Sequence, residues 1–144
     1  MKTKFGSGLK MKFIIFLFLA SHFSLSAEAS QNNWDKVAEE IEKALNNAAE
    51  AYEKGKKDEA MEMVADAYFG IFEGEKANME IAVRRFLSLK KASELEKGFA
   101  DLRKGIKDGI KPSDFKKQTS NLVETVKTAA KELDRKGVGL SSEL

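Results

Sequence analysis

Apolar side chains recur at three- and four-residue steps along most of this 144-residue chain, and this spacing constrains the fold more than any other feature. Such a period places the apolar groups on one face of an α-helix. The clearest example ends near Gly55 and contains Trp34, Val37, Ala38, Ile41, Leu45, Ala48 and Tyr52. No β-hairpin signal appears anywhere. We therefore predict an all-α fold.

Capping residues divide the chain into helices. The expected N-terminal signals are Asn32 or Asn33, Asp58, Asn78, the Ser93–Glu96 capping box and Pro112. The expected C-terminal signals are Gly55, Gly109 and Gly137. These positions predict a helical bundle of four longer helices plus one short helix.

The N-terminus is typical of a signal peptide. Lysines at positions 2, 4, 10 and 12 precede the apolar run 13–20, and Ala27 and Ala29 supply the small residues that a signal peptidase reads. The apolar run is too short for a bilayer span, which needs about 20 residues. We predict a signal peptide over residues 1–29, a bundle domain over 30–137 and a frayed tail over 138–144. The exported domain would be periplasmic or extracellular.

The residues that remain after cleavage near Ala29 exclude several functional classes. The chain has no Cys, and its only His, His22, belongs to the signal. Zinc, haem and the usual nucleophile–base pairs are therefore not expected, and the domain is not predicted to be an enzyme. Four lysines leave with the signal, so the domain is close to neutral and gives no electrostatic reason to bind nucleic acid. We expect a monomer or a weak dimer.

The segment 66–85 combines acids with a wide aromatic face. Acidic residues recur every seven positions at Glu59, Asp66, Glu73 and Glu80. On a straight helix neighbouring acids would lie roughly 10 Å apart, too far to share a metal ion. A solvated face with a Glu80–Arg84 pair is then the simplest interpretation.

A bend between Gly74 and Asn78 changes this interpretation. It would allow Glu73 and Glu80 to meet and, with an acid from another helix, to form an iron site with oxygen ligands only. The competing hypothesis is a clamp in which Arg84 or Arg103 neutralises the carboxylates. Tyr68 and Phe72, one turn apart, are expected to be at least largely buried against Ile41, Leu45 or Phe99.

The order of these motifs resembles the extracytoplasmic N-terminal region of bacterial iron permeases, relatives of the fungal high-affinity iron permease. The resemblance spans roughly residues 37–133. It rests on the sequence DAYFGIFE at 66–73 and on Asn78-Met79-Glu80, Leu95-Glu96, Phe99 and Leu102-Arg103, with Ala51-Tyr52, Gly55 and Ala60 upstream. The permeases transport through membrane helices that carry Arg-Glu-x-x-Glu motifs, and this chain has none.

The resemblance implies an exported accessory domain of iron uptake that binds or relays iron, or docks onto a membrane permease or another envelope protein. It is either a stand-alone relative or the front part of an interrupted permease. The candidate metal ligands are Glu73, Glu80, Asp66 and Glu96. The candidate structural or partner-facing residues are Tyr68, Phe69, Phe72 and Arg84. A metal-independent interaction module and an unrelated helical envelope protein remain the alternatives.

Overall fold

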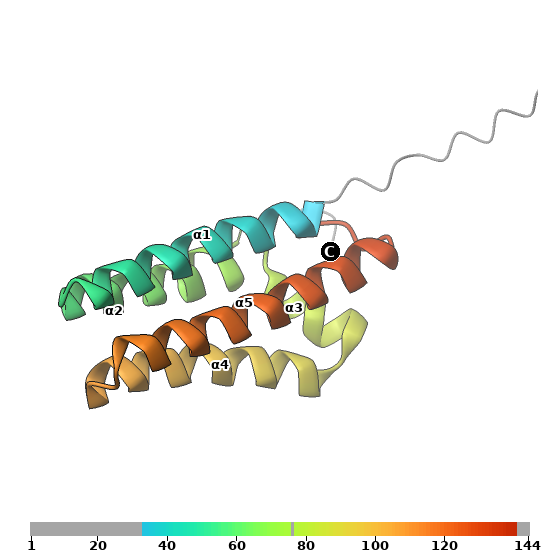
Figure 1. Cartoon of the computed structure of the whole chain (residues 1–144). Coiled ribbons are helices and arrows are strands. Elements are labelled where there is room, and N and C mark those ends of the chain that lie inside the picture. Colours follow the sequence, from blue (N-terminus) through green and yellow to red (C-terminus); the bar gives the residue numbers. More distant parts are fainter. Residues whose placement is uncertain (1–32, 76, 141–144) are drawn as a thin grey trace, which may run out of the picture.

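The computed structural model describes residues 33–75 and 77–140, and within them every regular element is a helix. The elements are α1 (Asn33–Glu53), α2 (Lys57–Ala65), the π-helical η1 (Asp66–Phe72), α3 (Met79–Ala82), the π-helical η2 (Val83–Leu87), α4 (Leu89–Asp108) and α5 (Pro112–Arg135). Helix α2 continues into η1, and α3 into η2, so four longer helices and one short helix form the bundle (Figure 1). The predicted fold is confirmed. The predicted signal, residues 1–29, lies outside the described residues.

Helix α1 begins at a cap supplied from the other end of the chain. Asp134, in the last turn of α5, accepts hydrogen bonds from the backbone N–H groups of Trp34 at 3.1 Å and Asp35 at 3.0 Å. The indole N–H of Trp34 donates to the carbonyl oxygen of Val138 at 2.6 Å. A carboxylate also complements the positive end of the helix dipole. These contacts join the first turn of α1 to the end of α5, and the two helices lie side by side (Figure 1).

Two of the expected helix starts are wrong. Helix α2 begins at Lys57, so Asp58 lies inside its first turn rather than at its cap. Helix α4 begins at Leu89, and the hydroxyl of Ser88 accepts a hydrogen bond from the N–H of Lys91 at 3.1 Å. The Ser93–Glu96 motif therefore lies within the helix. An extended serine just before the helix is the stronger signal, because its oxygen reaches the free N–H groups of the first turn.

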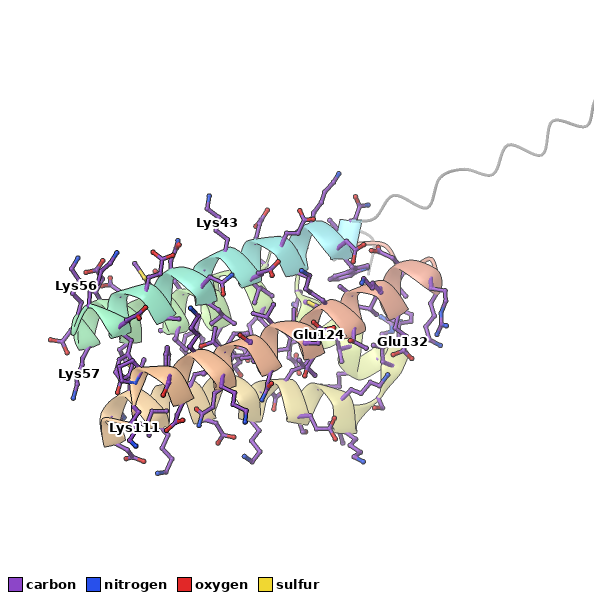
Figure 2. All side chains as sticks on the ribbon, viewed as in Figure 1. Lys43, Lys56, Lys57, Lys111, Glu124 and Glu132 are labelled. Carbon is purple, nitrogen blue, oxygen red and sulfur yellow. The ribbon has the colours of Figure 1, made fainter. Side chains whose placement is uncertain are left out.

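The turns α1–α2 and α4–α5 meet at one end of the bundle. Gly109 closes α4 in the left-handed conformation, with φ 68°, and Pro112 is the first residue of α5, both as predicted. The hydroxyl of Tyr52, near the end of α1, donates to the carbonyl oxygen of Ile110 at 2.7 Å. Figure 2 shows Lys56, Lys57 and Lys111 at this end.

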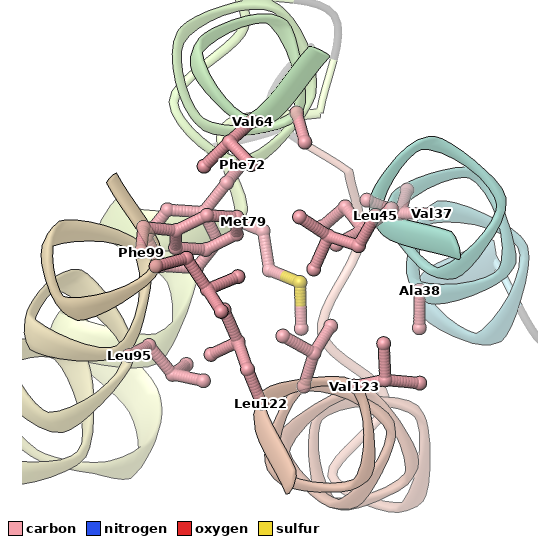
Figure 3. Packing of buried hydrophobic residues seen from close by; sticks show 14 of the residues in the cluster. Val37, Ala38, Leu45, Val64, Phe72, Met79, Leu95, Phe99, Leu122 and Val123 are labelled. Carbon is pink, nitrogen blue, oxygen red and sulfur yellow. The ribbon is translucent and has the colours of Figure 1, made fainter. Parts of the chain in front are cut away.

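The core is one continuous apolar cluster between the helices. The largest fully buried side chains include Trp34, Ile41, Leu45, Phe72, Met79, Phe99 and Phe115. Met79 opens the short helix α3 and lies among side chains of the longer helices, including Leu45, Phe72, Phe99 and Val123 (Figure 3). Burial of Met79 fixes the position of the next residue, Glu80.

Charged side chains cover the outside of the bundle, and a few of them connect helices. Lys127 of α5 binds Glu42 of α1 at 2.8 Å, and Lys91 of α4 binds Glu132 of α5. The pKa of the Glu132 carboxyl is lowered, chiefly by the hydrogen bond from Lys91. Lys43 points away from the bundle (Figure 2), and Glu124 is exposed on α5. Exposed pairs of this kind each add little stability.

The segment after α5 returns to the bundle. We expected residues 138–144 to be frayed, but Val138 and Leu140 pack against the core, because the indole of Trp34 holds the backbone there. Residues 141–144 lie outside the described part of the chain. None of the described helices is both long and apolar enough to span a bilayer.

Candidate functional site

The aromatic segment 66–72 forms a π-helix rather than an α-helix. Its wider turn is closed by the N–H of Glu73, which donates to the carbonyl oxygen of Tyr68 at 2.8 Å. Gly74 follows, and a Cβ there would lie 2.2 Å from the carbonyl oxygen of Gly70, so only glycine fits. Single-turn π-helices are frequent at functional sites.

The break after η1 lies where the sequence predicts it. Asn78 has the left-handed conformation, with φ 50°, and its side chain accepts a hydrogen bond from the N–H of Ile81 at 3.4 Å. Asn78 is therefore the N-cap of the short helix, as predicted. Asparagine tolerates this backbone conformation better than most residues. Because of this break, Glu73 lies at the end of η1 and Glu80 lies on the next helix, α3.

Three aromatic rings anchor η1 to α4. The ring of Phe72 lies 5.2 Å from that of Phe99 and 5.9 Å from that of Tyr68, measured between centroids. Tyr68 lies 5.2 Å from Phe99. Phe72 is fully buried and Tyr68 is half-buried. Phe72 is buried against Phe99 as predicted, whereas Tyr68 packs against Phe99 but is only half-buried, because its hydroxyl end lies near the surface beside Glu73.

Phe69 faces outward, and Arg103 of α4 covers it. The Phe69 side chain is 57% exposed, although its ring is 4.8 Å from that of Tyr68. The guanidinium of Arg103 lies 5.5 Å from the Tyr68 ring and 5.7 Å from the Phe69 ring. Within the described residues Arg103 has no hydrogen bond or ion pair to a carboxylate. An exposed ring and an arginine with free N–H donors therefore lie together on the surface.

Glu73 lies beside the hydroxyl of Tyr68 and affects its pKa. The pKa of the Tyr68 hydroxyl is raised to about 12, first by burial and then by its hydrogen bond to Glu73 and the negative charges of Glu73 and Glu96. The positive charge of Arg103 lowers the pKa of Tyr68, but by less than the other effects raise it. The hydroxyl therefore stays protonated and donates to the Glu73 carboxylate. No arginine in the described part of the chain forms an ion pair with Glu73, so the structure does not support the hypothesis that an arginine neutralises it.

Glu80 and Glu96 share one arginine. Arg84 of η2 binds Glu80, one turn earlier in the sequence, and Glu96 of α4, the latter at 2.7 Å. The Glu80 residue is only 9% exposed. The pKa of Arg84 is raised, chiefly by the hydrogen bond to Glu80. These contacts agree with the competing hypothesis, in which one arginine clamps the carboxylates.

The four candidate metal ligands do not converge on one point. Glu73 belongs to the Tyr68 network, whereas Glu80 and Glu96 belong to the Arg84 clamp; only Glu96 also acts on Tyr68. Asp66 lies exposed at the start of η1. Among residues 33–75 and 77–140, no three acidic side chains are arranged as ligands of one metal ion.

The sequence did not reveal that Arg103 lies over the rings of Tyr68 and Phe69. The sequence alone indicates Arg103 only as a possible partner of the carboxylates, because its position over two rings depends on how α4 packs against η1. The available signal was the aromatic face of η1, which is too wide for one core-facing stripe. A wide face of this kind needs a cover from another helix or from a partner.

Comparison with known proteins gives no further assignment. The sequence matches no family model and no curated protein, and the structure matches no solved structure.

Proposed function

We propose that this chain is an exported helical module of the cell envelope that docks onto a membrane protein through Phe69 and Arg103. The observation that carries the proposal is the exposed Phe69 ring beneath a guanidinium with no carboxylate partner among the described residues. The resemblance to the extracytoplasmic region of iron permeases suggests a permease of iron uptake as the partner.

The physical chemistry of this surface suits protein recognition. Aromatic and arginine side chains dominate the binding energy of many interfaces. Tyr68 lies beneath the guanidinium of Arg103 and beside Phe69, so both groups are held in place before binding. Less conformational entropy is then lost on association. The partner surface would offer an apolar contact to Phe69 and a carboxylate to Arg103.

Site-specific crosslinking in cells tests the docking surface. A photoreactive amino acid at position 69 should capture one membrane protein, and Arg103→Ala should abolish that adduct. Leu89 is the matched control, because it is 59% exposed and makes no aromatic contact with this cluster. An adduct that forms equally from position 89, or that persists in Arg103→Ala, would contradict the proposal.

Iron uptake tests the identity of the partner. Under iron limitation, cells with Phe69→Ala or Arg103→Ala should accumulate less radioactive iron than cells with the unchanged protein. Leu89→Ala should accumulate the normal amount. A capture of one membrane protein together with unchanged uptake would place the docking module outside iron transport.

Iron binding by the acids of this region is the second candidate function. One observation favours it: a single guanidinium brings the carboxylates of Glu80 and Glu96 together, close to the Tyr68–Glu73 pair. Carboxylate and phenol oxygens are the ligands that hard cations such as Fe³⁺ prefer. Iron would then have to displace Arg84 from between the two carboxylates.

Calorimetric titration with Fe²⁺ and Fe³⁺ tests this second function. Glu73→Gln and Glu80→Gln should weaken iron binding while the unfolding midpoint of Glu73→Gln stays unchanged. Glu62→Gln, on the exposed face of α2, is the control. If neither the unchanged protein nor Glu73→Gln binds iron, and Glu73→Gln is less stable, the acids hold the fold and not a metal.

A further inference from the structure

A small apolar pocket lies where α1, η1 and the segment after α5 meet. Its volume is about 190 Å³, and its apolar walls are formed by Val37, Ile71, Ala77 and Leu140. A dry cavity of about 150 Å³ is large enough for benzene. Pockets for drug-sized molecules begin at about 300 Å³. The volume therefore suits a single apolar side chain.

Gly70 borders this pocket. It lies within η1 at the pocket, and a Cβ built there would meet nothing within 4 Å. Its φ is not in the left-handed region, so neither space nor backbone conformation requires glycine. A glycine inside a helix costs about 1 kcal/mol relative to alanine. Gly74, by contrast, must be glycine, because a Cβ there would clash with the carbonyl oxygen of Gly70. The absence of a side chain at position 70 leaves room at the pocket.

Two opposite charges line the same pocket. Lys36 and Glu40, one turn apart on α1, are both exposed and both border it. Neither makes an ion pair within the described residues, not even with the other, although their spacing would permit one. A free ammonium and a free carboxylate thus lie beside an apolar cavity of side-chain size.

We propose that this pocket binds the zwitterion of a free apolar amino acid, such as leucine, methionine or phenylalanine. The apolar side chain enters between Val37, Ile71 and Leu140. The ligand carboxylate pairs with Lys36 and the ligand ammonium pairs with Glu40. Recognition of both charges and of the side chain would separate this ligand class from carboxylic acids, amines and glycine. The proposal is independent of docking through Phe69.

Nuclear magnetic resonance titration of the purified protein with leucine tests the proposal. Leucine should produce saturable shifts of the amide signals of Val37, Ile71 and Ala77. Leucinamide lacks the carboxylate, N-acetylleucine lacks the ammonium and glycine lacks the side chain. Leucinamide and N-acetylleucine should each bind up to about fivefold more weakly, since an exposed ion pair contributes up to about a factor of five. Glycine should produce no saturable shift, because it has no side chain to enter the pocket.

Variants of the pocket complete the test. Gly70→Val fills the opening and should abolish the leucine shifts, and Lys36→Met should weaken leucine binding about fivefold. Lys43→Met is the matched control, because Lys43 lies on α1 but points away from the bundle (Figure 2). No saturable shift with leucine, equal affinity for leucinamide, or unchanged affinity in Lys36→Met would each overturn the proposal.

Discussion

Asp134 and Trp34 lie 100 positions apart in the sequence, yet the carboxylate of Asp134 caps the helix that begins at Trp34. The Oδ1 atom accepts from the Trp34 N–H and the Oδ2 atom from the Asp35 N–H. Asp134 is only 8% exposed, so water cannot readily replace it.

Asp134→Ala should therefore lower the free energy of unfolding by about 1–2 kcal/mol, the usual effect of losing an N-cap. Urea denaturation followed by circular dichroism measures this change. Lys117→Ala, at an exposed position of α5, should change stability by less than about 0.5 kcal/mol. Equal stability of the two variants would mean that the cap contributes nothing.

Phe72 and Phe69 test the division between core and surface within η1. Phe72→Ala should cost about 3–5 kcal/mol, because the ring is fully buried against Phe99. Phe69→Ala should cost less than about 1 kcal/mol, because its ring is 57% exposed. Chemical denaturation of both variants gives the comparison. A small effect at Phe72 would instead place its ring on a partner-facing surface.

Thr119 offers a stabilising change. Its side-chain oxygen is buried on α5 and has no hydrogen-bond partner among the described residues. Thr119→Val replaces this hydroxyl by a methyl group of similar size and should raise the free energy of unfolding by about 1 kcal/mol. Thr128→Val, where the exposed hydroxyl donates to the carbonyl oxygen of Glu124 at 2.8 Å, should not stabilise. Thermal unfolding of the two variants distinguishes these outcomes.

Tyr68 should make stability depend on pH in the alkaline range. Its pKa is raised from 10.0 to about 12 in the folded state, so the folded protein keeps a proton that the unfolded chain loses. Stability should be fully present below pH 10 and fall as the pH rises from 10 to about 12.

The phenol carbon signals of isotope-labelled tyrosine report this titration, with Tyr52→Phe to assign them. Glu73→Gln should lower the pKa of Tyr68, because it removes both a negative charge and the carboxylate acceptor. Glu62→Gln should leave it unchanged. A Tyr68 signal that titrates near pH 10 in the unchanged protein would rule out the Glu73 interaction.

Gly70 and Gly74 should respond in opposite directions to the same substitution. Gly70→Ala should stabilise by about 0.5–1 kcal/mol, because its Cβ meets nothing within 4 Å. Gly74→Ala should destabilise by more than about 1 kcal/mol, since its Cβ would lie 2.2 Å from a backbone oxygen that cannot move aside. Thermal unfolding measures both. Destabilisation by Gly70→Ala would show that the position needs glycine for the fold.

Local features of the sequence determined the helices and most of the core. The apolar period of α1 predicted its buried face from Trp34 to Tyr52, because helix geometry places these residues on one side whatever they pack against. Asn78, Gly109 and Pro112 were also identified correctly, since each acts on the backbone within a few residues.

Tertiary structure decided the candidate site. The sequence offered Glu73, Glu80 and Glu96 as possible ligands and predicted the Glu80–Arg84 pair, but it could not show that Arg84 also binds Glu96 or that Tyr68 lies beside Glu73. It also could not place Arg103 over Phe69. Glu96 and Arg103 lie on α4, whereas Arg84 lies on η2 and Phe69 on η1, so the packing of α4 against η1 and η2 brings these partners together. Periodicity specifies the buried face of each helix, but the charge partners on its edges depend on the neighbouring helix.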